Sequence, residues 1–351
     1  MAIGTAGGGF DGNFSPIIYS KQAQIALRRS AVTNAITNNS YFGEIANQGD
    51  TVRIQKEPDV TVNSLQRHTG ISVEKLDDSD FSLTIDKDNY FAFKMDDIEE
   101  QFANVDFTSL AADRAAYKMA DAMDADVLSY LSGHTAAGAY ITTTSGDSQG
   151  TAGLTGELFT ANHLDATDFG NLTISGSATA GDSVQLAPRL PGATALSATT
   201  VSPLTVLARM ARKMDTQNVD ARGRWVVLDP VFVEMLKDED SRMLNGDFGG
   251  SGLQNGLVLN NIHGFRVYVS NSLPVKDTAG GAGKSGTTAQ QEDYGVIVAG
   301  QDDAVASAEQ INKVENYRDP DSFADIVRGM HLYGRKILRP EALITARYNA
   351  A

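Results

Sequence analysis

The chain of 351 residues contains no cysteine. This absence excludes disulfide bonds, thiolate metal sites and cysteine nucleophiles, and it is typical of a protein used in a reducing compartment. The N-terminus lacks the basic and then apolar segment of a cleaved signal peptide. No apolar run approaches the roughly 20 residues that span a membrane. The sequence therefore predicts a soluble protein that is made without an export signal.

Basic residues are scarce, with 29 Lys and Arg against 44 Asp and Glu, which gives a net charge of −15. Such a surface repels phosphate on average and has no basic stripe of the kind that binds DNA or RNA. A container for DNA is compatible with this repulsion, because a wall that held phosphate tightly would hinder packing and release. The 42% hydrophobic content is that of an ordinary folded protein, and 33 glycines indicate many loops.

The nearest approach to a nucleotide-binding motif is Gly280-Gly281-Ala282-Gly283-Lys284-Ser285. A phosphate-binding loop needs a further glycine five residues before the glycine of Gly-Lys-Ser, with a strand before the loop and a helix after it. Thr278 occupies that position, and Gly286-Thr287-Thr288 is a poor helix start. The segment therefore favours a surface loop over a nucleotide site.

The other polar clusters also lack the spacing that chemistry requires. The acidic clusters Asp77-Asp78-Ser79-Asp80 and Asp96-Asp97-Ile98-Glu99-Glu100 lack the pattern of a calcium loop or of a tuned carboxylate pair. No Gly-x-Ser-x-Gly nucleophile motif occurs. No HExxH motif or helical pair is found among the five histidines, His68, His134, His163, His263 and His331. We therefore predict no enzyme, with no catalytic, cofactor-binding or metal-ligating residue and no cofactor.

Two alternating stretches flank the polar residues 57–80. Val52 and Ile54 alternate with polar residues before this segment, and a run of alternating apolar residues from Phe81 to Met95 follows it. The pattern predicts a long two-stranded hairpin. Because such a ribbon is marginal alone in water, it implies a partner surface in its own chain or in a neighbour.

A long helix is predicted from Asp106 to Leu131, with Asp106 as N-cap and Ser132-Gly133 as the end. It would be about 39 Å long. One stripe is apolar: Ala112, Ala116, Met119, Met123, Val127 and Leu131. The opposite side carries charge: Asp113, Arg114, Lys118, Asp121 and Asp124. The pattern indicates a structural spine with one buried side.

After a Gly-, Ser- and Thr-rich region at 135–200, the chain alternates helices and strands. Within that region Leu172/Ile174 and Val184/Leu186 predict a small hairpin. Beyond it, Ser202 is a predicted cap with Pro203 at the first helical position, and Asp229-Pro230 opens a second helix. The predicted strands are Trp225–Leu228, Gly264–Val269, Tyr294–Ala299 and strands within 323–348.

Several motifs together resemble, in order and spacing, the Hong Kong 97-type major capsid proteins of tailed bacteriophages. The N-terminal ones are Phe14-Ser15-Pro16-Ile17-Ile18-Tyr19-Ser20, Gly43-Glu44-Ile45 and Gly49-Asp50-Thr51-Val52. The middle ones are Ile85-Asp86-Lys87, Tyr90-Phe91-Ala92-Phe93, Asp96-Asp97-Ile98-Glu99 and the helix 106–131. The C-terminal ones are Trp225-Val226-Val227-Leu228-Asp229-Pro230, Gly264-Phe265 through Pro274, Ala299–Ala306, Phe323-Ala324-Asp325 and Tyr333–Pro340. The resemblance spans nearly the whole chain except 135–200 and 277–291.

The resemblance implies an α+β, Hong Kong 97-like capsid fold. It divides the chain into an N-terminal arm (1–47), an extended β-hairpin loop (48–95), a peripheral domain with the spine helix (96–134), a β insertion (135–200), an axial α/β domain (201–310) and returning peripheral-domain strands (311–351). Lys56, Lys75 and Lys87 lie where some relatives form a lysine–asparagine crosslink, but no local motif identifies a crosslinking residue.

The implied function is that of a coat subunit that assembles into pentamers and hexamers of an icosahedral phage head around double-stranded DNA. The extended loop would overlap a neighbour, and the arm would clamp an adjacent subunit. The implied partners are other copies, a separate scaffolding protein, a portal and a decoration protein, with no membrane. The place of action would be the virion, after assembly in the host cytoplasm. Two alternatives are an encapsulin-type compartment shell and an α/β enzyme that uses the loop at Lys284.

Overall fold

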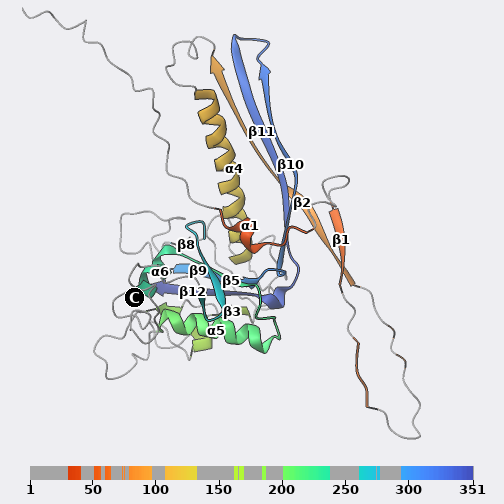
Figure 1. The fold of residues 1–351 in the computed structure, drawn as a ribbon, viewed down its shortest axis with the longest axis vertical. Coiled ribbons are helices and arrows are strands. Elements are labelled where there is room, and N and C mark those ends of the chain that lie inside the picture. The colour runs from red at the N-terminus through yellow and green to blue at the C-terminus, as the bar shows by residue number, and fades with distance from the viewer. Residues whose placement is uncertain are drawn as a thin grey trace, which may run out of the picture.

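A computed structural model shows two β-sheets joined end to end, with a long helix that runs from one to the other (Figure 1). The described residues are 31–40, 51–56, 60–64, 73, 75, 79–96, 107–132, 162–164, 166–169, 184–186, 201–237, 261–273, 275–276 and 294–350. Among them, no helix is long and apolar enough to cross a membrane.

An eight-stranded sheet forms one end of the molecule, with strand order β3-β12-β9-β5-β7-β6 and with β4 and β8 added beside β12 and β9. The bounds are β3 His163–Leu164, β4 Val184–Leu186, β5 Arg224–Leu228, β6 Asn261–Ile262, β7 Phe265–Val269, β8 Val275–Lys276, β9 Tyr294–Gln301 and β12 Leu343–Ala350. A short 3-10 helix, η2 (Ala166–Phe169), follows β3. The predicted strands at 225–228, 264–269 and 294–299 are thereby confirmed.

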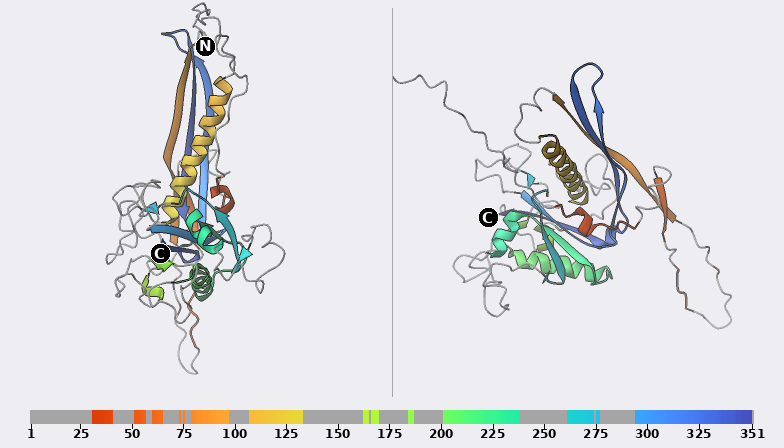
Figure 2. Two further views of the ribbon diagram at one scale, coloured as in Figure 1. Left: turned by 90° about the vertical axis from the view of Figure 1, so that its left-hand side faces the viewer. Right: turned by 45° about the horizontal axis from the view of Figure 1, so that its top comes forward.

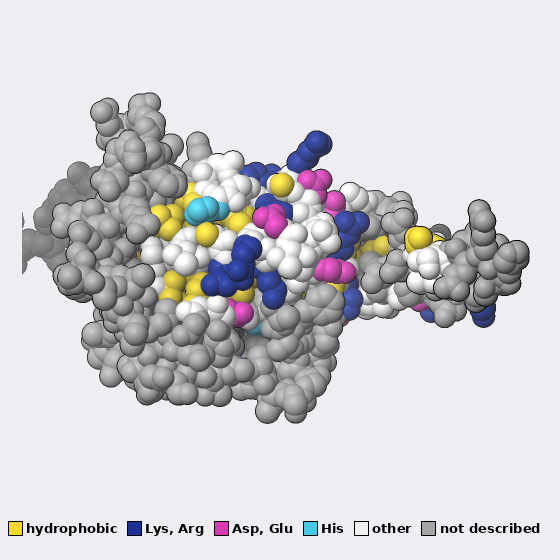
Figure 3. All heavy atoms as spheres, turned by 90° about the horizontal axis from the view of Figure 1, so that it is seen from below, with side chains coloured by type: hydrophobic (Ala, Val, Ile, Leu, Met, Phe, Trp, Pro, Cys, Tyr) yellow, Lys and Arg dark blue, Asp and Glu magenta, His cyan; other side chains and the backbone are white. Residues whose placement is uncertain are grey.

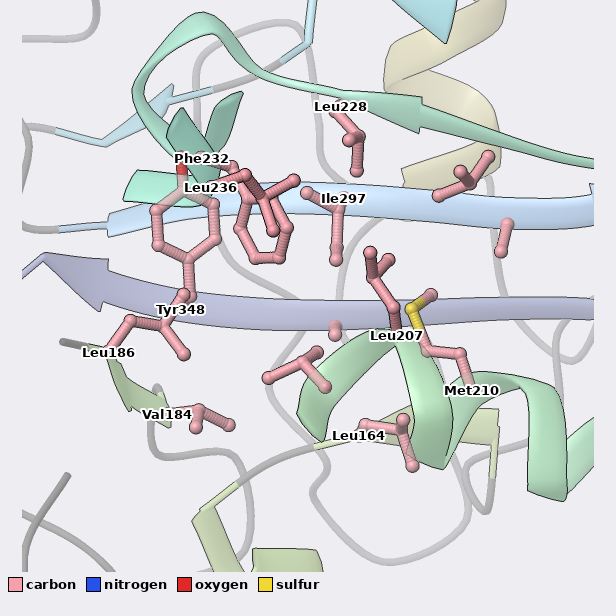
Figure 4. Packing of buried hydrophobic residues seen from close by; sticks show 14 of the residues in the cluster. Leu164, Val184, Leu186, Leu207, Met210, Leu228, Phe232, Leu236, Ile297 and Tyr348 are labelled. Carbon is pink, nitrogen blue, oxygen red and sulfur yellow. The ribbon is translucent and has the colours of Figure 1, made fainter. Parts of the chain in front are cut away.

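Helices α5 (Pro203–Thr216) and α6 (Pro230–Lys237) cover one face of this sheet. Both begin with proline at the first helical position, as predicted, because a missing N–H costs nothing there. Ser202 occupies the N-cap of α5, but its side chain makes no capping hydrogen bond. The helices bury their apolar side against the sheet, where Phe232 meets Tyr348 edge to face at 5.4 Å between ring centroids (Figure 4).

The other end is a four-stranded antiparallel sheet of order β1-β2-β11-β10. The bounds are β1 Thr51–Lys56, β2 Ser79–Asp96, β10 Val305–Arg318 and β11 Ala324–Ile337, with a short η6 (Pro340–Ala342) before β12. The predicted hairpin is confirmed, since β1 pairs with residues 79–84 of β2. The rest of β2 leaves β1 and pairs with β11, a partner that local alternation does not indicate.

The predicted long helix is α4, Phe107–Ser132, within one residue of the prediction at each end. It lies along one side of the four-stranded sheet and reaches the second face of the eight-stranded sheet (Figures 1 and 2). The apolar stripe is buried only in its C-terminal half, at Met123, Val127 and Leu131, whereas Ala116 is exposed. Only that half contacts both sheets.

Asp124 corrects the predicted charged side of this helix. Asp124 is only 2% exposed. Its Oδ1 accepts hydrogen bonds from the backbone N–H groups of Val32 and Thr33 and from Thr33 Oγ1. The helical spacing placed Asp124 near the charged side, but helix α1 (Thr33–Ile36) packs against it. The sequence alone does not show which segment covers a helix surface.

The predicted hairpin at 172–186 is not tested, because Leu172 and Ile174 lie outside the described residues, while Val184–Leu186 form β4 and pair in parallel with β12. Strand β10 extends to Arg318, as the returning strands implied for 311–351 allow, although the residue pattern alone indicated no strand at 307–318. Its polar residues lie on an edge strand, where weak burial leaves little alternation to detect. Residues 14–20, 43–45 and 246–256 also lie outside the described part, and the domain boundaries stay predictions.

Candidate assembly surfaces

The sequence predicts no site for chemistry. In the described ranges no three His, Asp or Glu side chains gather in a way that could hold a metal ion. The loop Gly280–Ser285 lies outside these ranges, as do His68 and His134. The prediction that the chain has no catalytic or cofactor-binding residue therefore stays a prediction, and the described surfaces are the place to look for function.

His163 is a buried packing residue in β3. Its Nδ1 lies at hydrogen-bond distance from Thr345 Oγ1 on the neighbouring strand β12. Burial, and then the nearby charge of Arg347, lower the pKa of His163 from 6.5 to about 3. The ring is therefore neutral near pH 7, because a low-dielectric site disfavours the imidazolium. This environment suits a structural histidine.

A second buried histidine belongs to a polar row on the α4 side of the four-stranded sheet. His331 Nε2 lies 3.5 Å from Glu309 Oε2, and its ring stacks on Tyr333 at 5.2 Å. Tyr333 Oη donates to Asp126 Oδ2 of α4 at 3.0 Å, and Arg335 pairs with the same carboxylate. The row links β10, β11 and α4 through these contacts, although His331 Nδ1 and Arg335 Nε are buried without a hydrogen-bond partner.

Two groups in this row, the Tyr333 hydroxyl and the Glu309 carboxyl, have shifted pKa values. Burial, and then the charge of Asp126, raise the pKa of the Tyr333 hydroxyl well above its usual range. The hydrogen bond from His331 lowers the pKa of Glu309. Both shifts favour the forms that hydrogen-bond in the fold, a neutral phenol and a carboxylate. The row stabilises the sheet–helix contact.

The connection between β1 and β2, residues 57–78, is called the excursion. Its described residues are 60–64, 73 and 75. Three β-branched side chains there are exposed: Val60 at 61%, Val62 at 94% and Val73 at 90%. Exposed apolar side chains that lie together in this way are typical of a contact with another surface.

The four-stranded sheet has a second uncovered surface, the side away from α4, here called the open face. Tyr90 and Met330 are cross-strand neighbours on it, 82% and 42% exposed. Tyr317 of β10 lies further along at 41%. Figure 2 shows α4 beside the opposite side of this sheet. Tyrosine and methionine are enriched in protein interfaces, so this face suits a contact with another chain.

Charge pairs frame the aromatic residues of the open face. Arg328 pairs with Glu315 at 2.8 Å and lies over the Tyr317 ring at 4.9 Å. Lys94 pairs with Asp319 at 2.6 Å, and this bond, with those from Ser322 and the Asp321 backbone, lowers the pKa of Asp319. Exposed pairs like these orient side chains more than they stabilise the fold. They hold Tyr317 and the nearby turn in one geometry.

The turn at the end of the β10–β11 hairpin displays a single aromatic side chain. Phe323 is 81% exposed. The turn beneath it is fixed by backbone bonds from Asp319 N to Ala324 O at 2.9 Å and from Ala324 N to Ser322 O at 3.0 Å. A fixed, exposed aromatic residue loses little entropy on binding. The hairpin end is therefore a further candidate contact.

The end of the molecule around α5 carries mixed charge. Figure 3 shows Lys and Arg interspersed with Asp, Glu and apolar side chains over the described surface. Arg224 pairs with Asp215, and Arg266 pairs with Asp302. Over the described part of this face, Lys and Arg form no continuous band.

Comparison with known proteins finds similarity in structure only. No protein-family model and no curated protein sequence matches the chain. Solved structures match over nearly its whole length. A chain from Mycobacterium phage Che8 is 22% identical with a TM-score of 0.64, covering 95% of this chain and 97% of that chain.

Two further structures carry the word capsid in their descriptions. A chain of the capsid of cyanophage P-SCSP1u is 18% identical with a TM-score of 0.61, covering 96% of this chain and 93% of that one. A chain of the mature capsid of bacteriophage PhiM1 is 15% identical with a TM-score of 0.60, covering 96% and 92%. The chain has the α+β, Hong Kong 97-like capsid fold, as its sequence motifs predicted.

Proposed function

We propose that the protein is the major capsid subunit of a tailed bacteriophage and assembles into pentamers and hexamers of an icosahedral head that encloses double-stranded DNA. The observation that carries this proposal is the shared fold over 96% of the chain with phage capsid structures, which are themselves covered to more than 90%. Coverage on both sides supports a subunit whose fold matches these capsid chains from end to end.

The two uncovered apolar surfaces support the same proposal. The excursion and the open face lie on different parts of one chain, so a contact between them in two copies would join unlike surfaces. Unlike contacts of this kind generate rings when the rotation closes. In the proposal the excursion of each subunit overlaps the open face of its neighbour, and residues 1–30 clamp an adjacent subunit.

The proposal names further partners. A separate scaffolding protein would guide closure, a portal would occupy one vertex, and a decoration protein would bind outside. DNA would be enclosed without sequence-specific binding, as the net charge of −15 favours. The assembled protein would be found in the virion, after assembly in the host cytoplasm.

Negative-stain electron microscopy tests the proposal. The purified protein would be imaged alone and after co-expression with the neighbouring candidate scaffolding gene. We expect closed shells, or sheets and tubes of hexamers, in at least one condition. Small monodisperse particles in both conditions would contradict the proposal, and nucleotide binding by the wild type but not by Lys284→Ala would then support the enzyme alternative.

A deletion tests the excursion separately. Lys56 and Ser79 are paired across β1 and β2, so a two-residue turn can replace residues 57–78 without disturbing the strands. We expect folded, soluble subunits that fail to close shells. Far-ultraviolet circular dichroism is the control for folding. Normal shells from this variant would show that the excursion makes no essential contact between subunits.

A further inference from the structure

Residues 31–40, here called the strap, lie across the junction between the two sheets. The strap contains the one-turn helix α1, which lies against α4 in Figure 1. Val32 and Ile36 are 5% and 1% exposed. They belong to the core cluster that also includes side chains from α4, β5, β9, β10 and β11. The strap therefore completes the one core that both sheets share.

One end of the strap is held by Asp124 of α4. Its Oδ1 accepts from Val32 N at 2.8 Å, from Thr33 N at 3.0 Å and from Thr33 Oγ1 at 2.8 Å. Asp124 forms no ion pair with the basic residues that the structure describes. A buried carboxylate without donors is costly. The burial of Asp124 is thus compensated by the strap itself.

The other end of the strap is held by the first residues of β10. Asn38 N donates to Val305 O at 2.8 Å, and Ser307 N donates to Asn38 O at 3.3 Å. Thr37 Oγ1 and Ser307 Oγ are 2.7 Å apart. Strand β10 begins here, directly after the turn that follows β9 of the eight-stranded sheet. The strap is therefore fixed at α4 and at the point where the chain passes between the sheets.

We propose that the strap is a conformational latch. When it is engaged, Val32 and Ile36 fill the junction, and α4 with the four-stranded sheet keeps one orientation relative to the eight-stranded sheet. When it is released, the junction loses two buried side chains and Asp124 gains access to water, so the sheets rock about the remaining contacts. Packed junctions of this kind have discrete arrangements because a void is costly.

The latch also gives the proposed capsid subunit a means to respond to a neighbour. Residues 1–30 continue directly into the strap, so a contact that they make with another copy acts on its engagement. This regulatory role rests on the proposed function. The latch itself is a property of the single subunit and can be measured without assembly.

Spin-label distance measurement tests the latch. Because the chain has no cysteine, Asp321→Cys at the hairpin end and Thr205→Cys on α5 give one labelled pair, measured at concentrations that keep subunits unassembled. We expect one narrow distance distribution, broadened or shifted by Asp124→Ala. Asp113→Ala, an exposed position on the same helix, is the matched control and should change nothing. Hydrogen exchange at Val32 and Thr33 should accelerate at least tenfold in Asp124→Ala.

Fast exchange at the strap with an unchanged distance distribution would overturn the latch. If Asp124→Ala fails to fold, truncation replaces it: removal of residues 1–40 should broaden the distribution, whereas removal of residues 1–30 should not. Identical distributions for the two truncations would also overturn it. Failure of the wild type to form shells would contradict the proposed function and leave these outcomes unaffected.

Discussion

The eight-stranded sheet is covered by helices on both faces, whereas the four-stranded sheet is covered by a helix on one face only. Helices α5 and α6 cover one face of the first sheet, and α4 covers the second face. Strand β5 of the eight-stranded sheet is buried at every residue. The four-stranded sheet has α4 on one side only, and Tyr90 on the other side is 82% exposed. One sheet supplies stability, and the other offers surface.

This difference indicates where substitutions act. Side chains buried on both faces of a sheet contribute to the free energy of unfolding of the single subunit. Exposed aromatic residues contribute little to it and become important only when another chain covers them. The comparison therefore predicts that the two sheets separate stability from assembly, and four predictions, each from a substitution with or without a control, sharpen that comparison.

The largest effect on stability is expected in the eight-stranded sheet. Phe232→Ala removes a fully buried ring that packs on Tyr348 and should lower the free energy of unfolding by about 3–5 kcal/mol. Urea unfolding measures this change. Val314→Ala, at a position 53% exposed in the four-stranded sheet, is the matched control and should cost about 0.5 kcal/mol or less. Equal decreases in the free energy of unfolding for the two variants would contradict the proposed difference between the sheets.

The next effect is expected where the four-stranded sheet is tightest. A Cβ at Gly334 would meet the backbone oxygen of Thr84, which cannot move without the strand, whereas one at Gly329 would meet the Phe91 ring, which can rotate. Gly334→Ala should therefore cost about 1–3 kcal/mol, at the upper end for overpacking, and Gly329→Ala should cost less. Thermal unfolding of the two variants gives the order. The reverse order would contradict this reading of the β2–β11 contact.

A smaller effect is expected from acid. The His331 hydrogen bond lowers the folded-state pKa of Glu309 below its ordinary 4.5. This stabilisation is present above pH 4.5 and is lost as the pH falls through the lower folded-state value. A partly exposed pair of this kind contributes about 1 kcal/mol or less. Glu309→Gln should be less stable than the wild type at pH 7, and the difference should shrink as the pH falls below 4.5. A constant difference between pH 7 and pH 3 would exclude Glu309 as the cause.

The smallest effect on the subunit should accompany the largest effect on assembly. Tyr90→Asp changes an exposed side chain and should alter the free energy of unfolding by about 0.5 kcal/mol or less. It should nevertheless abolish shell formation, seen by light scattering and electron microscopy, because a charge would be buried in the contact. Val269→Asp, at a 42% exposed position of the eight-stranded sheet, should still assemble. Normal shells from Tyr90→Asp would show that the open face is not an interface.

Much of the fold could be predicted because its strongest elements carry local signals. The stripe from Ala112 to Leu131 predicted α4, and the alternation around Val52 and Leu83 predicted the β1–β2 pairing. The exposed side of β2 follows from the alternation, because Tyr90 belongs to the set opposite Leu83 and Phe93. The sequence pattern did not show that β11 and β10 extend this side into the open face.

The sequence by itself determined the helices α4, α5 and α6, most strands, the absence of cysteine chemistry and the acidic charge, because these depend on neighbouring residues or on composition alone. The tertiary structure decided which strands share a sheet, that β12 returns to lie between β9 and β3, and that Asp124 is covered by the strap. The physical reason is the distance along the chain between residues that contact each other. Periodicity records which side of an element is apolar, whereas the partner of that side can lie far along the chain, as Val32 and Asp124 do.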